Sequence, residues 1–310
     1  METYRDLSAL KFQFPTAVGL GNFDGVHVGH QILLTKLKEL SKKNNLKSVV
    51  ITFEPLPSRV LTPHKAAHLI TTACQKENII RSFGIDFLVV SLFTREFSRI
   101  NYTDFIYDYL IKKYNAKLVI VGYDYKFGYM GKGNASRIKQ ICNKEGISVV
   151  IVPPVRHEGK VVSSTLIRSL IKTGAVRKAS EYLGRNFSIE GKIIHGDGVG
   201  TKLGYPTANI CIPDNVILPA RGVYAVLALW GGLTYQGVAN LGYKPTFNGN
   251  EIRLEVHIFN FNKDIYGKEI KVEFVDIIRK EVKFNSVEQL VAQVKNDSLA
   301  AKSILSKFCS

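Results

Sequence analysis

The chain has 310 residues, 45% hydrophobic and 22% charged, which is typical of a globular protein with room for two domains. Its charged first residues lack the apolar block of a signal peptide, and no apolar run reaches the length of a membrane span, so we expect no membrane association. The net charge is +16, but the lysines are dispersed, which favours anionic small substrates over nucleic acid. The cysteines lack C-x-x-C spacing, which predicts free thiols in a cytoplasmic protein; they are Cys74, Cys142, Cys211 and Cys309.

The first half alternates short apolar runs with helical patterns. Strands are predicted at 16–21, 48–53, 87–90, 118–121 and 149–152, and helices near 29–44, 74–83, 102–114 and 134–145. Continuously apolar strands alternating with helices predict an α/β domain with a doubly wound parallel sheet, covered on both faces. Ligands bind such sheets beyond the carboxyl ends of the strands.

The second half has a different period. A helical stretch from Thr165 to Leu183 closes the first half, and segments of period two then follow. These strands are predicted at 187–195, 222–230, 234–241, 252–258 and 269–277, before a terminal helix at 286–307. We predict a small antiparallel β-barrel with a C-terminal helix. The change of period places the domain boundary between residues 184 and 185, giving domains 1–184 and 185–310.

A ten-residue run joins the first apolar strand to the first helix. Its two histidines form an H-x-G-H pattern, which is typical of nucleotidyl transferases. Glycines let the backbone approach a nucleotide, and the helix start offers free N–H groups to phosphate. Histidines three residues apart lie on one side of a helical turn, where both can donate to phosphate. The run is Gly21, Asn22, Phe23, Asp24, Gly25, Val26, His27, Val28, Gly29 and His30.

Three further segments fit the same predicted site. Thr52–Pro55 ends the second strand, and Gly122–Gly128 follows the fourth. In the latter, aromatic rings such as Phe127 can sandwich a planar ring while Asp124 accepts from its polar edge. Ser163–Arg168 offers hydroxyls at a helix start followed by an arginine, which suits a triphosphate, although Ser-Ser-Thr is also a common helix cap. The candidate residues of this segment are Ser164, Thr165 and Arg168.

A glycine-rich segment opens the second half. It matches neither the Walker A pattern nor the dinucleotide fingerprint, and such segments are most often turns, but its N–H groups can wrap phosphate. In an extended 207–211 segment, Thr207 and Asn209 point the same way and offer two oxygens to a cation such as Mg²⁺. The other candidate residues here are Gly196, Gly198, Gly204 and Pro206.

Glu255 is the candidate general base. It lies on the polar face of an alternating strand, between Leu254 and Val256. A carboxylate there can take a proton from an attacking hydroxyl. From the residues alone, an exposed strand glutamate is the simpler interpretation.

Taken together, these motifs resemble the bifunctional bacterial riboflavin kinase/FAD synthetase family over nearly the whole chain. The resemblance implies that the first half adenylylates FMN to FAD with ATP, with His27 and His30 stabilising the transferring phosphoryl group. It implies that the second half phosphorylates riboflavin with ATP and Mg²⁺, with Glu255 as base. Asn240 and Arg279 match family segments around the flavin and nucleotide. The chain departs from the family pattern at Leu56, Thr201 and Lys244.

Three alternatives remain open. The first is an adenylyltransferase with one activity and a second half that only binds ligand. The second is a class I aminoacyl-tRNA synthetase, although no Lys-Met-Ser-Lys-Ser-like loop is present. The third is a basic nucleic-acid binder, which would show steeply salt-dependent binding. We expect no metal at His64 and His68, which lack further ligands nearby, and no obligate protein partner.

Overall fold

The computed structural model describes residues 1–5, 10–198, 200, 203–246 and 249–308. The chain divides into two compact units, Met1–Ser164 and Thr165–Ser310. Within the described residues, no helix is long and apolar enough to cross a bilayer.

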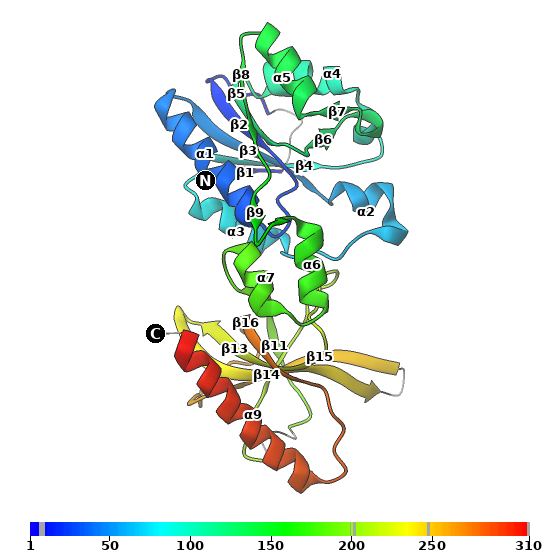
Figure 1. Cartoon of the computed structure of the whole chain (residues 1–310), viewed down its shortest axis with the longest axis vertical. Coiled ribbons are helices and arrows are strands. Elements are labelled where there is room, and N and C mark those ends of the chain that lie inside the picture. The colour runs from blue at the N-terminus through cyan, green and yellow to red at the C-terminus, as the bar shows by residue number, and fades with distance from the viewer. Residues whose placement is uncertain (6–9, 199, 201–202, 247–248, 309–310) are drawn as a thin grey trace. The chain divides into compact units, whose positions relative to one another are not determined.

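The first unit, blue through green in Figure 1, is built on a parallel sheet, as predicted, with six strands where the sequence predicted five. The strand order is β1-β4-β3-β2-β5-β8, so the chain winds outward in both directions from β2. The order reverses between β2 and β5, which makes their carboxyl ends the topological switch point where ligands bind. The strands are β1 (Glu2–Tyr4), β2 (Thr16–Leu20), β3 (Lys47–Glu54), β4 (Phe87–Leu92), β5 (Ala116–Gly122) and β8 (Ser148–Val152). Only the three-residue edge strand β1 lacked a predicted counterpart.

Helices cover both faces of this sheet because its strands are apolar on both sides. Helix α1 (Val28–Lys43) packs on β2, β3 and β5, with Leu33, Leu34 and Leu37 in the same buried cluster as Ala17. Gly19 permits this close packing, since a Cβ there would lie 2.9 Å from Leu37 Cδ2. The opposite face packs against η3 (Phe105–Lys113) and α5 (Ala135–Lys144).

One predicted helix differs in detail from the observed one. The segment predicted near 102–114 begins as α4 (Tyr102–Asp104) and continues in η3 as a π-helix. At its end, the Tyr114 N–H donates to the Tyr109 carbonyl five residues earlier, at 2.8 Å. The shorter elements of this unit are α2 (Pro57–Leu61), η1 (Pro63–Lys65), α3 (Ala73–Ser82), η2 (Phe97–Arg99), β6 (Lys126–Phe127), η4 (Tyr129–Gly131), β7 (Gly133–Asn134), β9 (Arg156–His157) and β10 (Lys160–Val161).

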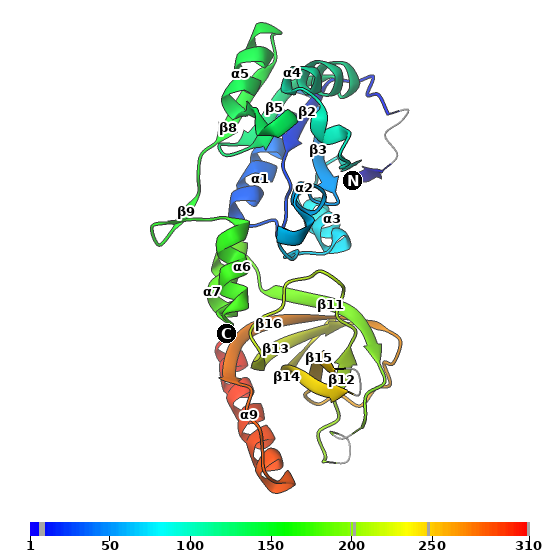
Figure 2. The same ribbon diagram turned by 90° about the vertical axis from the view of Figure 1, so that its right-hand side faces the viewer.

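The second unit contains the predicted antiparallel barrel and C-terminal helix. The barrel is closed in the order β11-β12-β15-β14-β13-β16, and Figure 2 shows helix α9 alongside it. The elements are α6 (Ser164–Lys172), α7 (Val176–Leu183), β11 (Phe187–Ile194), β12 (Ala208–Ile210), β13 (Gly222–Trp230), β14 (Leu233–Thr246), β15 (Gly249–Ile258), β16 (Glu269–Lys280) and α9 (Val287–Phe308).

The helical stretch predicted from Thr165 to Leu183 is two helices rather than one. The chain turns between them at Gly174, whose φ is +81°. A Cβ there would lie 3.1 Å from Ile277 Cδ1 and 3.2 Å from the Tyr224 hydroxyl. Both the dihedral angle and the close approach require glycine, so the helical pattern cannot continue through this position.

Alternation along β13 divides the buried side chains of the second unit into two layers. Val223, Ala225 and Leu227 share a cluster with Ala301 and Leu305 of α9. The intervening residues, Tyr224, Val226 and Ala228, are fully buried and point into the barrel. Helix α9 therefore covers the outer surface of this part of the barrel wall.

Candidate active sites

The turn after β2 places the H-x-G-H residues at the switch point of the sheet. The Gly21 N–H donates to the Ile51 carbonyl of neighbouring β3 at 3.3 Å. Phe23 and Val26 both have positive φ, +52° and +38°, with fully buried side chains. Positive φ angles at two non-glycine residues store backbone strain, and the packing of their side chains in the core offsets it.

His27 and His30 lie together at the start of α1. His27 is the N-cap of the helix, and its Nδ1 accepts the His30 backbone N–H at 3.3 Å. The two imidazole rings are stacked, with centroids 3.7 Å apart and planes 13° apart. With Nδ1 accepting, a neutral His27 carries its proton on Nε2. The arrangement combines two imidazoles with the unpaired N–H groups of a helix start.

His30 is neutral at pH 7. Burial lowers its pKa well below the ordinary value, and the neighbouring His27 lowers it further. Its Nδ1 is buried and has no hydrogen-bond partner among the described residues. A phosphate above the rings would favour the charged imidazole, so this site responds electrostatically to an anionic ligand.

Asp24 anchors the turn to the segment that precedes α3. Its Oδ1 accepts the backbone N–H groups of Ile70 at 3.0 Å and Thr71 at 3.4 Å. The Ser164 hydroxyl donates to the Asp24 carbonyl at 3.0 Å. The structure therefore joins Ser164 to the H-x-G-H turn. Thr165 and Arg168 lie on α6 in the second unit.

Lys76 is a buried cation beside this turn that the sequence analysis did not identify. Its Nζ donates to the Thr52 hydroxyl at 3.3 Å, and that hydroxyl donates to the Asn22 carbonyl at 3.0 Å. Burial lowers the pKa of Lys76, while Glu54 and Asp24 oppose that shift. Its spacing from Ile80 on α3 is the signal that places it on the buried face.

An aromatic cavity of about 370 Å³ lies beside the same turn. Phe127 lines it, together with Asn22, Phe97 and Tyr125. The rings of Tyr125 and Phe127 stack at 5.7 Å, and the buried Tyr125 hydroxyl has no partner within the described ranges. Asp124 is exposed and is not among the lining residues.

In the second unit, the register of the barrel aligns four candidate residues in one row. Directly paired residues on adjacent strands place their side chains on the same face of a sheet. The row runs across five strands as Asn209 on β12, Glu255 on β15, Asn240 on β14, Val223 on β13 and Arg279 on β16.

Gly196 and Gly200 of the glycine-rich segment lie close to the start of β12. A Cβ on Gly196 would collide with the Asn209 amide, and one on Gly200 would lie 3.3 Å from the Thr207 hydroxyl. The Asn209 side chain is buried, and its Oδ1 has no partner in the part of the chain that the structure describes. Gly198 and Gly204 have positive φ, +69° and +82°. Thr201 lies outside the described residues, as does the side chain of Lys244.

Two cavities meet at Thr207. The first, of about 310 Å³, lies between the barrel wall and α9, and its lining includes Glu255, Asn240 and Leu290. The second, of about 270 Å³, is lined by Pro206, Thr207, Phe261 and Tyr266, among others. Thr207 lines both cavities, whereas Glu255 lines the first.

Arg279 is held by an ion pair that sequence reasoning missed. Its Nε and Nη2 donate to both carboxylate oxygens of Asp297 on α9, at 2.8–3.1 Å. The Gln293 amide donates to the same carboxylate at 2.9 Å. Asp297 is only 4% exposed. Arg279 therefore lines the larger cavity while fastening α9 to β16.

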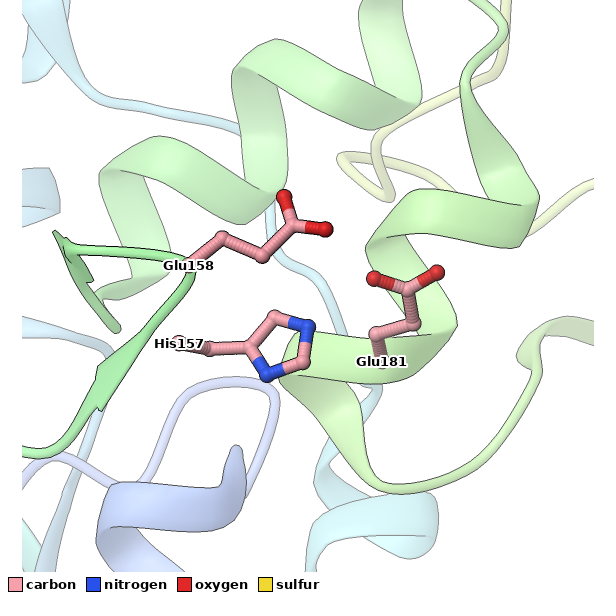
Figure 3. Close-up of side chains that lie close together, drawn as sticks. All are labelled: His157, Glu158 and Glu181. Atoms are coloured by element: carbon pink, nitrogen blue, oxygen red, sulfur yellow. The ribbon is translucent and has the colours of Figure 1, made fainter.

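Figure 3 draws three further side chains that could bind a metal, His157, Glu158 and Glu181. His157 and Glu158 belong to the first unit and Glu181 belongs to α7 of the second. Because the positions of the chain's parts relative to one another are not determined, these residues are not assigned a site.

Comparison with known proteins covers both units. Residues 10–166 match the family described as FAD synthetase, and residues 183–305 match the family described as riboflavin kinase. A bifunctional riboflavin kinase/FMN adenylyltransferase of Buchnera aphidicola subsp. Schizaphis graminum is 40% identical over 291 residues, 93% of each chain. The Bacillus subtilis protein of that name is 37% identical, covering 93% of this chain and 92% of its own. A crystal structure described as a macrolide-efflux protein from Streptococcus pneumoniae superposes with a TM-score of 0.86 at 35% identity, over 96% of this chain and 97% of that one.

Proposed function

Because this chain belongs to the bifunctional riboflavin kinase/FMN adenylyltransferase family and carries both activities, we propose which of its residues perform each reaction. ATP, riboflavin and FMN are the substrates that the family implies. The observation that supports this assignment is that each unit has a cavity near chemically suitable side chains, the stacked histidines in the first unit and the Glu255 row in the second.

Adenylyl transfer takes place above His27 and His30. A phosphate oxygen of FMN attacks the α-phosphorus of ATP, the bond to the bridging α–β oxygen breaks, and pyrophosphate leaves with the electron pair. Imidazole N–H groups and the α1 N-terminus stabilise the charge on these oxygens. The strained turn after β2 and the stacked His27 and His30 rings support this role in adenylyl transfer, because both fix the imidazole donors before substrate binds. The flavin ring occupies the aromatic cavity lined by Phe127 and Tyr125.

Phosphorylation takes place where the two barrel cavities meet. Riboflavin occupies the cavity under α9, and ATP occupies the cavity lined by Tyr266. Glu255 accepts the proton of the ribityl 5′-hydroxyl as its oxygen attacks the γ-phosphorus; the bond to the β–γ bridging oxygen breaks and ADP leaves. The shared position of Thr207 supports this assignment.

Mg²⁺ fits the residues at the start of β12. Asn209 offers a buried oxygen that has no hydrogen-bond partner within the described ranges, and the Thr207 hydroxyl lies beside the glycine-rich segment. Hard cations prefer such oxygen ligands. When bound, Mg²⁺ would neutralise phosphate charge. The chain's own contribution is to hold the Asn209 oxygen opposite Glu255 through the β12–β15 pairing, with Thr207 just before the ladder begins.

We further propose that the adenylyltransferase module ends at residue 184 and the kinase module begins at 185. The start of the kinase family match at residue 183 and of β11 at Phe187 supports this boundary. The compact units instead divide between Ser164 and Thr165, which places α6 and α7 with the barrel. The free cysteines Cys74, Cys142 and Cys211 support action in the reducing cytoplasm. Both reactions use small molecules, so no nucleic acid or obligate protein partner is needed.

The test is a time course with purified protein, riboflavin, ATP and Mg²⁺, in which riboflavin, FMN and FAD are separated by chromatography. We expect FMN to form first and FAD to follow, with both reactions lost when EDTA removes the metal. A matched reaction that starts from FMN isolates the second step. Failure to form FMN from riboflavin would refute the kinase assignment, and failure to form FAD from FMN would refute the adenylyltransferase assignment.

A further inference from the structure

His257 makes a hydrogen bond to the segment that carries Thr207. It lies on β15 two residues after Glu255, so both side chains project from the same face of the strand. Its Nδ1 is 2.8 Å from the Pro206 carbonyl oxygen. A carbonyl oxygen only accepts hydrogen bonds, so Nδ1 carries the proton and donates.

The surroundings of His257 show what this hydrogen bond holds in place. Its ring meets the Tyr205 ring edge-on, with centroids 5.5 Å apart, and the two residues line the cavity under α9 together with Thr207. The β12–β15 ladder begins only at Ala208, which pairs with Val256. The Pro206 carbonyl therefore lies before the first ladder pair, where a side chain instead of a strand neighbour binds it.

We propose that His257 is a positioning residue for the kinase reaction, which fixes the Pro206–Thr207 backbone so that Thr207 stands beside Glu255. It acts through Pro206 and not on a reacting atom. The inference rests on the proposed role of Thr207 in binding metal and phosphate. Small displacements of such a group are costly, since misplacement by about 1 Å can slow a reaction about 100-fold.

The test compares two substitutions whose side chains have the same number of heavy atoms. In His257→Asn, the side-chain amide can place an N–H close to the position of Nδ1, whereas His257→Leu has no donor. We expect His257→Leu to lower kcat for FMN formation about 10- to 100-fold and to raise the Mg²⁺ concentration needed for half-maximal rate. We expect His257→Asn to retain most of the wild-type kcat. FAD formation from FMN, which the first unit performs, serves as the internal control and is expected to stay unchanged in both variants.

The kinetic constants separate positioning from simple packing. A residue that only fills the cavity wall would raise KM for riboflavin equally in both variants and leave kcat unchanged, and that result would overturn the proposal. Should His257→Leu fail to fold, His257→Gln replaces it, because its amide lies one bond farther from the strand and misses Pro206. Equal kcat values for the Asn and Gln variants would also overturn the proposal.

Thr207→Ala distinguishes the inference from the function on which it rests. Full kinase activity in Thr207→Ala would overturn the assignment of Thr207 itself. Loss of activity in Thr207→Ala together with wild-type kcat in His257→Leu would overturn only the positioning role of His257. We expect Thr207→Ala and His257→Leu both to lose kinase activity, with the larger loss in Thr207→Ala.

Discussion

Asn209 and Glu255 are direct partners across the antiparallel β12–β15 ladder. Directly opposed residues in such a ladder have Cα atoms about 5 Å apart and side chains on the same face. The relative positions of the proposed metal ligand and the proposed base are therefore fixed by backbone hydrogen bonds within a closed barrel.

Replacing Glu255 with Gln should separate the two activities. The amide keeps the shape of the side chain but cannot accept the hydroxyl proton, so phosphorylation of riboflavin should slow about 10²- to 10⁴-fold. FAD formation from supplied FMN should continue at the wild-type rate. Glu269→Gln, at the exposed start of β16, is the matched control. Unchanged FMN formation in Glu255→Gln would remove this residue from the mechanism.

Replacing His30 with Ala should have the opposite effect. Loss of one donor to transition-state charge typically costs about 10²- to 10³-fold in kcat, so FAD formation should fall by that factor while FMN accumulates. The matched control is His64→Ala, which changes an exposed histidine of the same unit, in η1. The two-site assignment fails if His30→Ala lowers both activities equally in a folded protein.

The lowered pKa of the half-buried His30 should make stability depend on pH. The folded pKa lies below the ordinary value of about 6.5, so the unfolded chain binds more protons than the folded chain once the pH falls below 6.5. The contribution of His30 to the free energy of unfolding should therefore be constant above that pH and should decrease below it. Urea midpoints measured at about pH 7.5 and about pH 5.5 test this. His30→Gln should show a smaller decrease, and an identical decrease would contradict the prediction.

Asp297→Ala should loosen α9. It leaves the Arg279 guanidinium, 21% exposed in the pair, without its bidentate partner, at a cost of about 1–3 kcal/mol. Because Leu290 and Val294 of the same helix line the larger cavity, KM for riboflavin should rise as well. Asn296 is exposed on the same turn, so Asn296→Ala should change neither the free energy of unfolding nor the KM for riboflavin. A drop in the denaturation midpoint without a change in KM would separate helix docking from flavin binding.

The prediction for α6 and α7 shows where local pattern fails. The apolar period of residues 165–183 is helical throughout, and the sequence analysis joined it into one segment. The break occurs at Gly174, whose φ of +81° ends the helical conformation, and a glycine at such a position is a local signal for a helix end. The close approach of Tyr224 and Ile277 to residue 174 is a long-range contact that the local pattern does not contain.

The sequence by itself determined the fold class of each half and the H-x-G-H turn, because strand period, helix period and the glycine turn are local properties of consecutive residues. It also placed Glu255 on the polar face of its strand. Only the tertiary structure decided which distant residues meet: Asn209 with Glu255, Arg279 with Asp297, and His257 with Pro206. These pairings follow from strand register, barrel closure and the docking of α9, which depend on long-range packing that no single segment encodes.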